Sequence, residues 1–185
     1  FRLKREVPAP LNLEIALGEE VFSLCERLLP DCVCLVPEKR EERTTEGGLA
    51  VAGREGIIQE TIARIESLGV AVSLFLDPEL EAIEAAFSAG AKRLELHTGR
   101  YADAPPQEKP KALEDIEQAA KLAQSLGMGV HAGHGLHVDN VGPVAAIREI
   151  EELNIGHAIV ARAIFVGMAE AVAEMRRAIA WARGF

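Results

Sequence analysis

The chain has 185 residues, of which 49% are hydrophobic and 26% charged, and it carries a formal net charge of -9 at pH 7. This length supports one sizeable core and is short for two ordinary domains, so we expect a single domain over residues 1–185. The acidic balance excludes a broad basic surface for nucleic acid, and no apolar run approaches the roughly 20 residues that a membrane span needs. The cysteines, Cys25, Cys32 and Cys34, are odd in number and lack CxxC spacing, which is typical of buried thiols in a cytoplasmic protein.

The first residues, FRLKRE, resemble the end of an amphipathic helix and not a natural beginning. We therefore expect that the natural protein has an amino-terminal part before Phe1. Such a part would also supply further elements of the fold predicted below.

Short apolar runs alternate with helical patterns along the chain. The expected strands are 11–17, 32–36, 70–76, 93–97, 129–132 and 153–156. The expected helices are 19–29, 53–68, 78–89, 110–126, 141–153, 158–166 and 168–183. Three of these helices are followed by Gly69, Gly90 and Gly127, and glycine suits the left-handed position after a helix. The regular alternation predicts parallel strands joined by right-handed crossovers.

Polar side chains fall at the carboxyl ends of nearly all the expected strands. They are Glu14, Glu38, Asp77, Glu95, His97, His131, His134 and His157. In a barrel these strand ends converge on one mouth. A doubly wound sheet collects its ligand groups at one switch point and usually has a glycine-rich first turn, which this chain lacks. We therefore predict an α/β fold, a (β/α)₈ TIM barrel, with about six of its eight βα units in this chain.

Two carboxylates interrupt apolar strands. Glu14 has apolar neighbours on both sides, so we expect it to lose hydration, which would raise its pKa and suit a general acid or base. The alternative is a solvent-facing residue of an edge strand. Glu95 shares a strand face with Arg93 and His97, and near the barrel mouth it can orient an imidazole or stabilise a cation. The alternative there is an internal ion pair between Arg93 and Glu95.

The segment 131–137 combines three histidines with two glycines. Glycine allows the backbone to approach a ligand closely, and histidine titrates near neutral pH, so we expect His134 to transfer protons. A metal site is the alternative suggested by the histidine spacing. Against it, a loop with two glycines does not hold imidazoles rigidly, and no HExxH pattern follows.

The segment Asn154-Ile155-Gly156-His157 precedes the expected short helix over 158–166. In many barrels the last strand's loop and such a helix present backbone N–H groups to a phosphate. An ordinary strand–helix turn is the alternative. The polar segment 41–48 is a candidate mobile lid. Lys39, just before it, is a possible Schiff-base residue, but the charged neighbours favour an exposed, protonated amine.

Together these segments resemble the pyridoxine 5′-phosphate synthase family of vitamin B6 biosynthesis. The matching stretches, in family order, are NLE at 12–14, CLVPEKR at 34–40, TTEGG at 44–48, ELHTGRYA at 95–102, AGHGL at 132–136 and ELNIGHA at 152–158. The family is a (β/α)₈ barrel, of which this chain would form about the C-terminal three quarters. Family members are homo-oligomers, and the resemblance implies an octamer.

The resemblance also implies an activity. Family members are cytoplasmic transferases that condense 1-deoxy-D-xylulose 5-phosphate with 3-amino-2-oxopropyl phosphate, giving pyridoxine 5′-phosphate, inorganic phosphate and water. They use no cofactor and no essential metal. By resemblance Glu14 is a proton acceptor, His134 is a proton donor, and Glu95 stabilises a cationic transition state. The implied substrate-binding residues are Thr44 for the deoxyxylulose phosphate and Gly135, Gly156 and His157 for the amino-ketone phosphate.

The chain departs from the family pattern in two respects. The Asn-x-Asp-His and His-x-Arg segments of the family's first two strands do not occur in it, and His131 stands where the family has asparagine. Two other functions stay open on the residues alone. One is another phosphosugar aldolase or epimerase, which needs a Schiff-base lysine or a metal. The other is a non-catalytic, phosphate-binding remnant of a barrel.

Overall fold

A computed structural model describes residues 1–37 and 47–185. In this part of the chain a six-stranded sheet contains β1 (Asn12–Ala16), β2 (Cys32–Val36), β3 (Ala71–Leu76), β4 (Arg93–His97), β5 (Gly129–Gly133) and β6 (Ile150–Asn154). Every neighbouring pair is parallel, and the strands lie in the sheet in the same order as in the sequence. A doubly wound sheet reverses its strand order at a switch point, so the observed order belongs to part of a (β/α)₈ barrel and confirms the predicted fold class.

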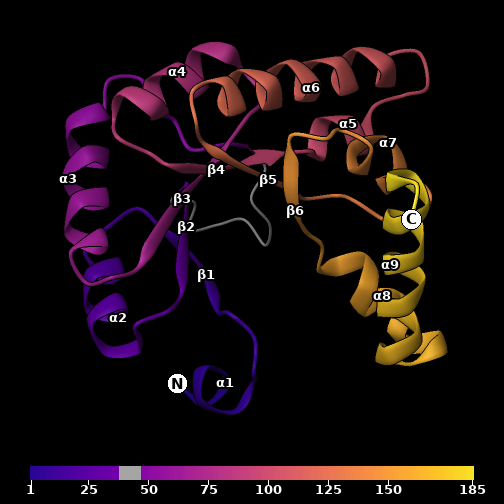
Figure 1. Ribbon diagram of the computed structural model, residues 1–185, viewed down its shortest axis with the longest axis horizontal. Helices are drawn as coiled ribbons and strands as arrows, with labels where there is room; N and C mark the ends of the chain where they lie inside the picture. Colours follow the sequence, from indigo (N-terminus) through magenta and orange to yellow (C-terminus); the bar gives the residue numbers. More distant parts are fainter. Residues whose placement is uncertain (38–46) are drawn as a thin grey trace.

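Helices connect the strands and cover the outer side of the sheet (Figure 1). The helices of the described residues are α1 (Arg2–Glu6), α2 (Glu20–Leu28), α3 (Glu55–Glu66), α4 (Leu80–Ser88), α5 (Gly99–Asp103), α6 (Lys109–Ser125), α7 (Val141–Ala145), α8 (His157–Val166) and α9 (Met168–Arg183). Helices α3, α4 and α6 pack on strands β3 to β5, while α8 and α9 pack on each other after β6. None of these helices is long and apolar enough for a transmembrane span.

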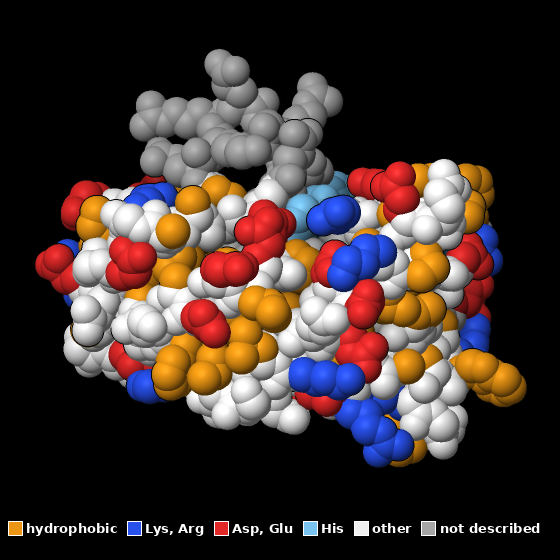
Figure 2. Space-filling view, turned by 90° about the horizontal axis from the view of Figure 1, so that it is seen from above, with side chains coloured by type: hydrophobic (Ala, Val, Ile, Leu, Met, Phe, Trp, Pro, Cys, Tyr) orange, Lys and Arg blue, Asp and Glu red, His pale blue; other side chains and the backbone are white. Residues whose placement is uncertain are grey.

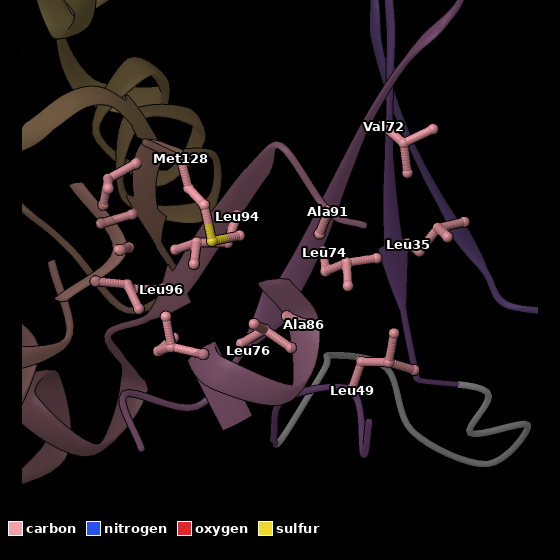
Figure 3. Packing of buried hydrophobic residues seen from close by; sticks show 14 of the residues in the cluster. Leu35, Leu49, Val72, Leu74, Leu76, Ala86, Ala91, Leu94, Leu96 and Met128 are labelled. Carbon is pink, nitrogen blue, oxygen red and sulfur yellow. The ribbon is translucent and has the colours of Figure 1, made fainter. Parts of the chain in front are cut away.

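The core lies between the sheet and its outer helices (Figure 3). Side chains alternate along a strand, so one face of each strand carries the leucines and valines that meet the helices. Leu35, Leu74, Leu94 and Leu96 are fully buried there. The opposite face points to the interior of the curved sheet and carries Glu14, Cys34, Ser73, Glu95 and His131, whose backbones are linked by the strand registers. The fold therefore separates an apolar outer layer from a polar inner one.

Most of the expected elements are present within one or two residues. The expected glycine ends are confirmed, because Gly69, Gly90 and Gly127 have φ values of 79°, 87° and 79°. These left-handed conformations cost a glycine little and end α3, α4 and α6 just before β3, β4 and β5. Each connection is thereby kept short, and the next strand starts beside the previous one.

The region after β5 differs from the prediction. The expected helix over 141–153 and strand over 153–156 are wrong: α7 ends at Ala145, and β6 runs from Ile150 to Asn154. The misleading feature is the pair Glu151 and Glu152, both exposed, which gives the segment a helical composition. Pairing with β5, including Glu152 opposite His131, overrides that local preference.

Candidate active site

The carboxyl ends of the strands surround a cavity of about 450 Å³. Its lining includes Glu14 from β1, Glu95 from β4, His134 and Gly135 after β5, and Gly156 and His157 at the start of α8. These residues are up to 143 positions apart in the sequence, and parallel strands in sequential order bring them to one edge. Thr44 and Lys39 lie outside the described residues. In Figure 2 histidine side chains are visible at the molecular surface, with acidic and basic side chains beside them.

Glu14 does not have the environment that the sequence predicted. Its side chain is exposed, whereas the apolar neighbours in the sequence indicated desolvation. The reason is that β1 pairs only with β2 in the described sheet, so no strand covers its other side. The expected burial of Glu14 is therefore wrong in this structure. Glu14 lines the cavity with a side chain that is also exposed to solvent.

Glu95 is the buried carboxylate of the site, with only 3% of its surface exposed. Its Oε2 accepts a hydrogen bond of 2.7 Å from Nδ2 of Asn154 and one of 3.7 Å from the Cys34 thiol. Burial raises the pKa of Glu95 to about 7; the hydrogen bond from Asn154 opposes this rise, and the negative charge of Glu14 adds to it. Arg93 is exposed and forms no ion pair with Glu95 in the described structure, so the alternative of an internal pair is wrong.

His134 lies in a loop held in an uncommon conformation. Its φ of 82° is in the left-handed region, which a residue with a side chain rarely adopts, and the next residue, Gly135, has a φ of 74°. The carbonyl oxygen of His134 accepts a hydrogen bond from the hydroxyl of Thr98, which fixes the loop onto the end of β4. Burial, with a contribution from the neighbouring His97, lowers the pKa of His134. At neutral pH this environment therefore favours the neutral imidazole.

A second imidazole supports the first. The ring of His97 packs edge-on against the ring of His134, with 4.9 Å between centroids. Nδ1 of His97 lies 2.9 Å from Oδ1 of Asp77, whose other oxygen accepts a hydrogen bond of 2.9 Å from the backbone N–H of Gly48. Asp77, which directly follows β3, therefore contacts both Gly48 and His97. Through His97 it is also connected to His134. The sequence placed Asp77 and His97 at strand ends, but nothing in it showed this contact.

The cavity also contains the elements of an anion site. Gly156 precedes α8, and the N–H groups in the first turn of a helix have no carbonyl partner within the helix. The helix dipole adds a partial positive charge at this end. Within the described residues no three His, Cys, Asp or Glu side chains converge in the manner of metal ligands.

A larger cavity, of about 830 Å³, adjoins the first one. His134 lines both cavities, and the larger one is otherwise bounded by α4, α5 and α6, with Asp77, His97 and Arg100 in its wall. His134 therefore stands between two volumes that solvent or ligands can enter. This position makes the imidazole accessible from two sides.

The sequence matches the family model described as "Pyridoxal phosphate biosynthesis protein PdxJ" over residues 1–181. The chain belongs to the PdxJ family. The resemblance found in the motifs is thereby confirmed, and the chain is placed among the enzymes of vitamin B6 synthesis. Proteins named "Pyridoxine 5'-phosphate synthase" from Legionella pneumophila (strain Paris) and Coxiella burnetii (strain Dugway 5J108-111) are each 50% identical to it over 182 residues. The match covers 98% of this chain and 73% and 76% of those two proteins.

Solved structures that resemble this PdxJ chain are more distant in sequence. One is the crystal structure of the Amycolatopsis orientalis BexX/CysO complex, with a TM-score of 0.59 and 18% identity; the match covers 88% of this chain and 59% of that one. Another is a xylose isomerase domain protein from Planctomyces limnophilus, with a TM-score of 0.55 and 13% identity over 91% of this chain and 70% of that one. At these identities the likeness concerns the fold alone.

Proposed function

We propose that this protein is a pyridoxine 5′-phosphate synthase, a transferase that condenses 1-deoxy-D-xylulose 5-phosphate with 3-amino-2-oxopropyl phosphate into pyridoxine 5′-phosphate, inorganic phosphate and water. The observation that carries the proposal is the cavity of about 450 Å³, in which Glu14, Glu95 and His134 surround one space beside the start of α8. Membership of the PdxJ family supports the same reaction.

The chemistry requires several proton transfers. An amine and a ketone form an imine with loss of water, and ring closure and elimination of phosphate follow. We assign Glu14 the role of proton acceptor, because its exposed carboxylate borders the cavity. Glu95 stabilises the cationic intermediates, since a buried carboxylate interacts strongly with a charge that develops near it. His134 is the proton donor.

Substrate binding would prepare His134 for that role. Burial lowers the pKa of His134. We assign Gly135, Gly156 and His157 to the phosphate of the amino ketone, next to the free N–H groups of α8. A phosphate dianion beside the imidazole favours its protonated form. The donor would therefore become charged when the substrate arrives.

The remaining assignments extend the family resemblance. Thr44 would contact the deoxyxylulose phosphate. The protein would be cytoplasmic and a homo-oligomer, an octamer as in the family, and would use no cofactor. Support for self-association comes from apolar side chains exposed on α8 and α9, namely Val160, Ile164, Phe165, Met168 and Trp181.

The proposal is tested by incubating the purified protein with both substrates and measuring pyridoxine 5′-phosphate and released phosphate. We expect the two products in equal amounts and neither when one substrate is omitted. The His134→Asn variant should lower kcat by about 10²- to 10⁴-fold, the usual contribution of a general acid. The proposal would be contradicted if the wild-type protein formed no pyridoxine 5′-phosphate, or if His134→Asn kept full turnover.

A further inference from the structure

Glu95 is held by residues from two strands that are not its neighbours in the sheet. It lies on β4, between β3 and β5, whereas Cys34 belongs to β2 and Asn154 is the last residue of β6. The hydrogen bonds from Asn154 and Cys34 therefore cross the interior of the curved sheet. Local sequence does not require either contact.

Both donors bind the same carboxylate oxygen, Oε2. The other oxygen, Oε1, accepts no hydrogen bond in the described part of the chain and lies against Gly133. A side chain at Gly133 would collide with Oε1 and would also come within 2.8 Å of the backbone oxygen of Asn154. The carboxylate thus has one fixed oxygen and one that remains available beside the cavity that Glu95 lines.

Asn154 and Cys34 can act only as donors in this arrangement. The amide Nδ2 of Asn154 carries hydrogens and no lone pair for hydrogen bonding. Burial and the nearby Glu95 raise the pKa of Cys34 well above the usual range, so its sulfur keeps its proton. Both contacts therefore favour the ionised form of Glu95, in opposition to its burial.

We propose that Asn154 and Cys34 are positioning residues that hold Glu95 through Oε2, so that Oε1 is the atom that meets the reacting molecule. This inference rests on the proposed function for the identity of that molecule. The charges of Glu14 on β1 and Glu152 on β6 also raise the pKa of Glu95, and His131 lies opposite Glu95 on β5. They are unchanged in the variants below.

The first test measures Glu95 without substrate. The ¹³C resonance of its side-chain carboxyl, identified by its loss in Glu95→Gln, is followed against pH in the purified protein. In Asn154→Leu, which removes the donor and keeps a side chain branched at Cγ, we expect the titration midpoint to move from about 7 to higher pH by about one pH unit. Cys34→Ala should give a smaller shift in the same direction.

Matched variants separate this effect from general damage. Cys34→Ser keeps a donor and should restore the wild-type midpoint. Cys32→Ala changes the neighbouring thiol on the same strand face, whose sulfur bonds to the carbonyl of Val33 and not to Glu95, and should leave the midpoint unchanged. Unchanged midpoints in both Asn154→Leu and Cys34→Ala would overturn the proposal. If Asn154→Leu does not fold, the comparison of Cys34→Ala with Cys34→Ser decides.

The second test links the positioning to turnover. If ionised Glu95 is required, the acidic limb of the pH–rate profile should follow the titration midpoint. Asn154→Leu would then lose activity about fivefold at pH 7, as the ionised fraction falls for a one-unit shift, and recover it above about pH 9. A midpoint that moves while the limb stays supports the positioning by Asn154 and contradicts the role given to Glu95 in the proposed function.

Discussion

Glu14 and Glu95 look alike in the sequence, yet the fold gives them opposite surroundings. Both interrupt an apolar strand and both face the interior of the curved sheet. Glu14 is exposed on β1, at one edge of the described sheet, while Glu95 is 3% exposed on β4, between two paired strands. The difference shows that strand pairing, and not the neighbours in the sequence, determines which carboxylate is desolvated.

The charge of Glu14 also affects the ionisation of Glu95. The negative charge of Glu14 contributes to the raised pKa of Glu95, after burial as the main cause. One site therefore contains a carboxylate in contact with water and another that changes its charge near neutral pH. Such a pair can divide acid and base roles between its members.

The largest effect that can test this comparison is on turnover. We expect Glu95→Gln and Glu14→Gln each to lower kcat by about 10²- to 10⁴-fold. We expect the wild type to show an acidic limb near pH 7 that arises from the ionisation of Glu95, and only Glu95→Gln should abolish it. In Glu14→Gln the limb should move to lower pH, since a negative charge near Glu95 is removed. A limb near pH 7 that persists in Glu95→Gln would assign it to another group.

A smaller effect is expected on stability. The pKa of Glu95 rises from 4.5 to about 7 on folding, so its protonated form stabilises the fold below pH 4.5 and this contribution is lost as the pH rises through 7. The shift corresponds to a loss on the order of 3 kcal/mol in the free energy of unfolding. Glu95→Gln should avoid that loss.

Urea unfolding at pH 5 and pH 8 measures this difference. The stability of Glu95→Gln relative to the wild type should increase between the two pH values. Glu14→Gln is the comparison variant: because the charge of Glu14 contributes to the raised pKa of Glu95, this variant should keep the pH dependence of the wild type at a reduced size. A constant difference between Glu95→Gln and the wild type would show that Glu95 is not desolvated.

The smallest expected effect is on stability, at Gly133, which packs against Oε1 of Glu95. A methyl group in Gly133→Ala would press on Oε1 of Glu95 and on the Asn154 backbone, so we expect a loss of about 1–3 kcal/mol. Gly129→Ala, four residues earlier on β5, meets nothing closer than the flexible side chain of Arg93 at 3.4 Å and should change stability by less than about 0.5 kcal/mol. Thermal unfolding compares the two, and equal losses would argue against tight packing at Gly133.

Much of the fold could be predicted because its signals are local. The alternation of apolar positions gave the strands, and the glycines after α3, α4 and α6 gave their ends. The prediction failed at β6, because Glu151 and Glu152 give this segment a local preference for a helix. Pairing with β5 makes it a strand. The site showed the same limit: polar residues at strand ends indicated a common mouth, but the contacts of Asp77 with His97 and of Asn154 with Glu95 had no local signal.

The sequence by itself determined the parallel βα architecture, the residue types at the cavity and membership of the PdxJ family. The tertiary structure alone decided that Glu95 is buried and Glu14 exposed, and that Cys34 and Asn154 meet at one oxygen. The physical reason is that propensity and turn chemistry act between residues close in the chain. Desolvation and hydrogen bonding across a curved sheet depend on residues that only folding brings together.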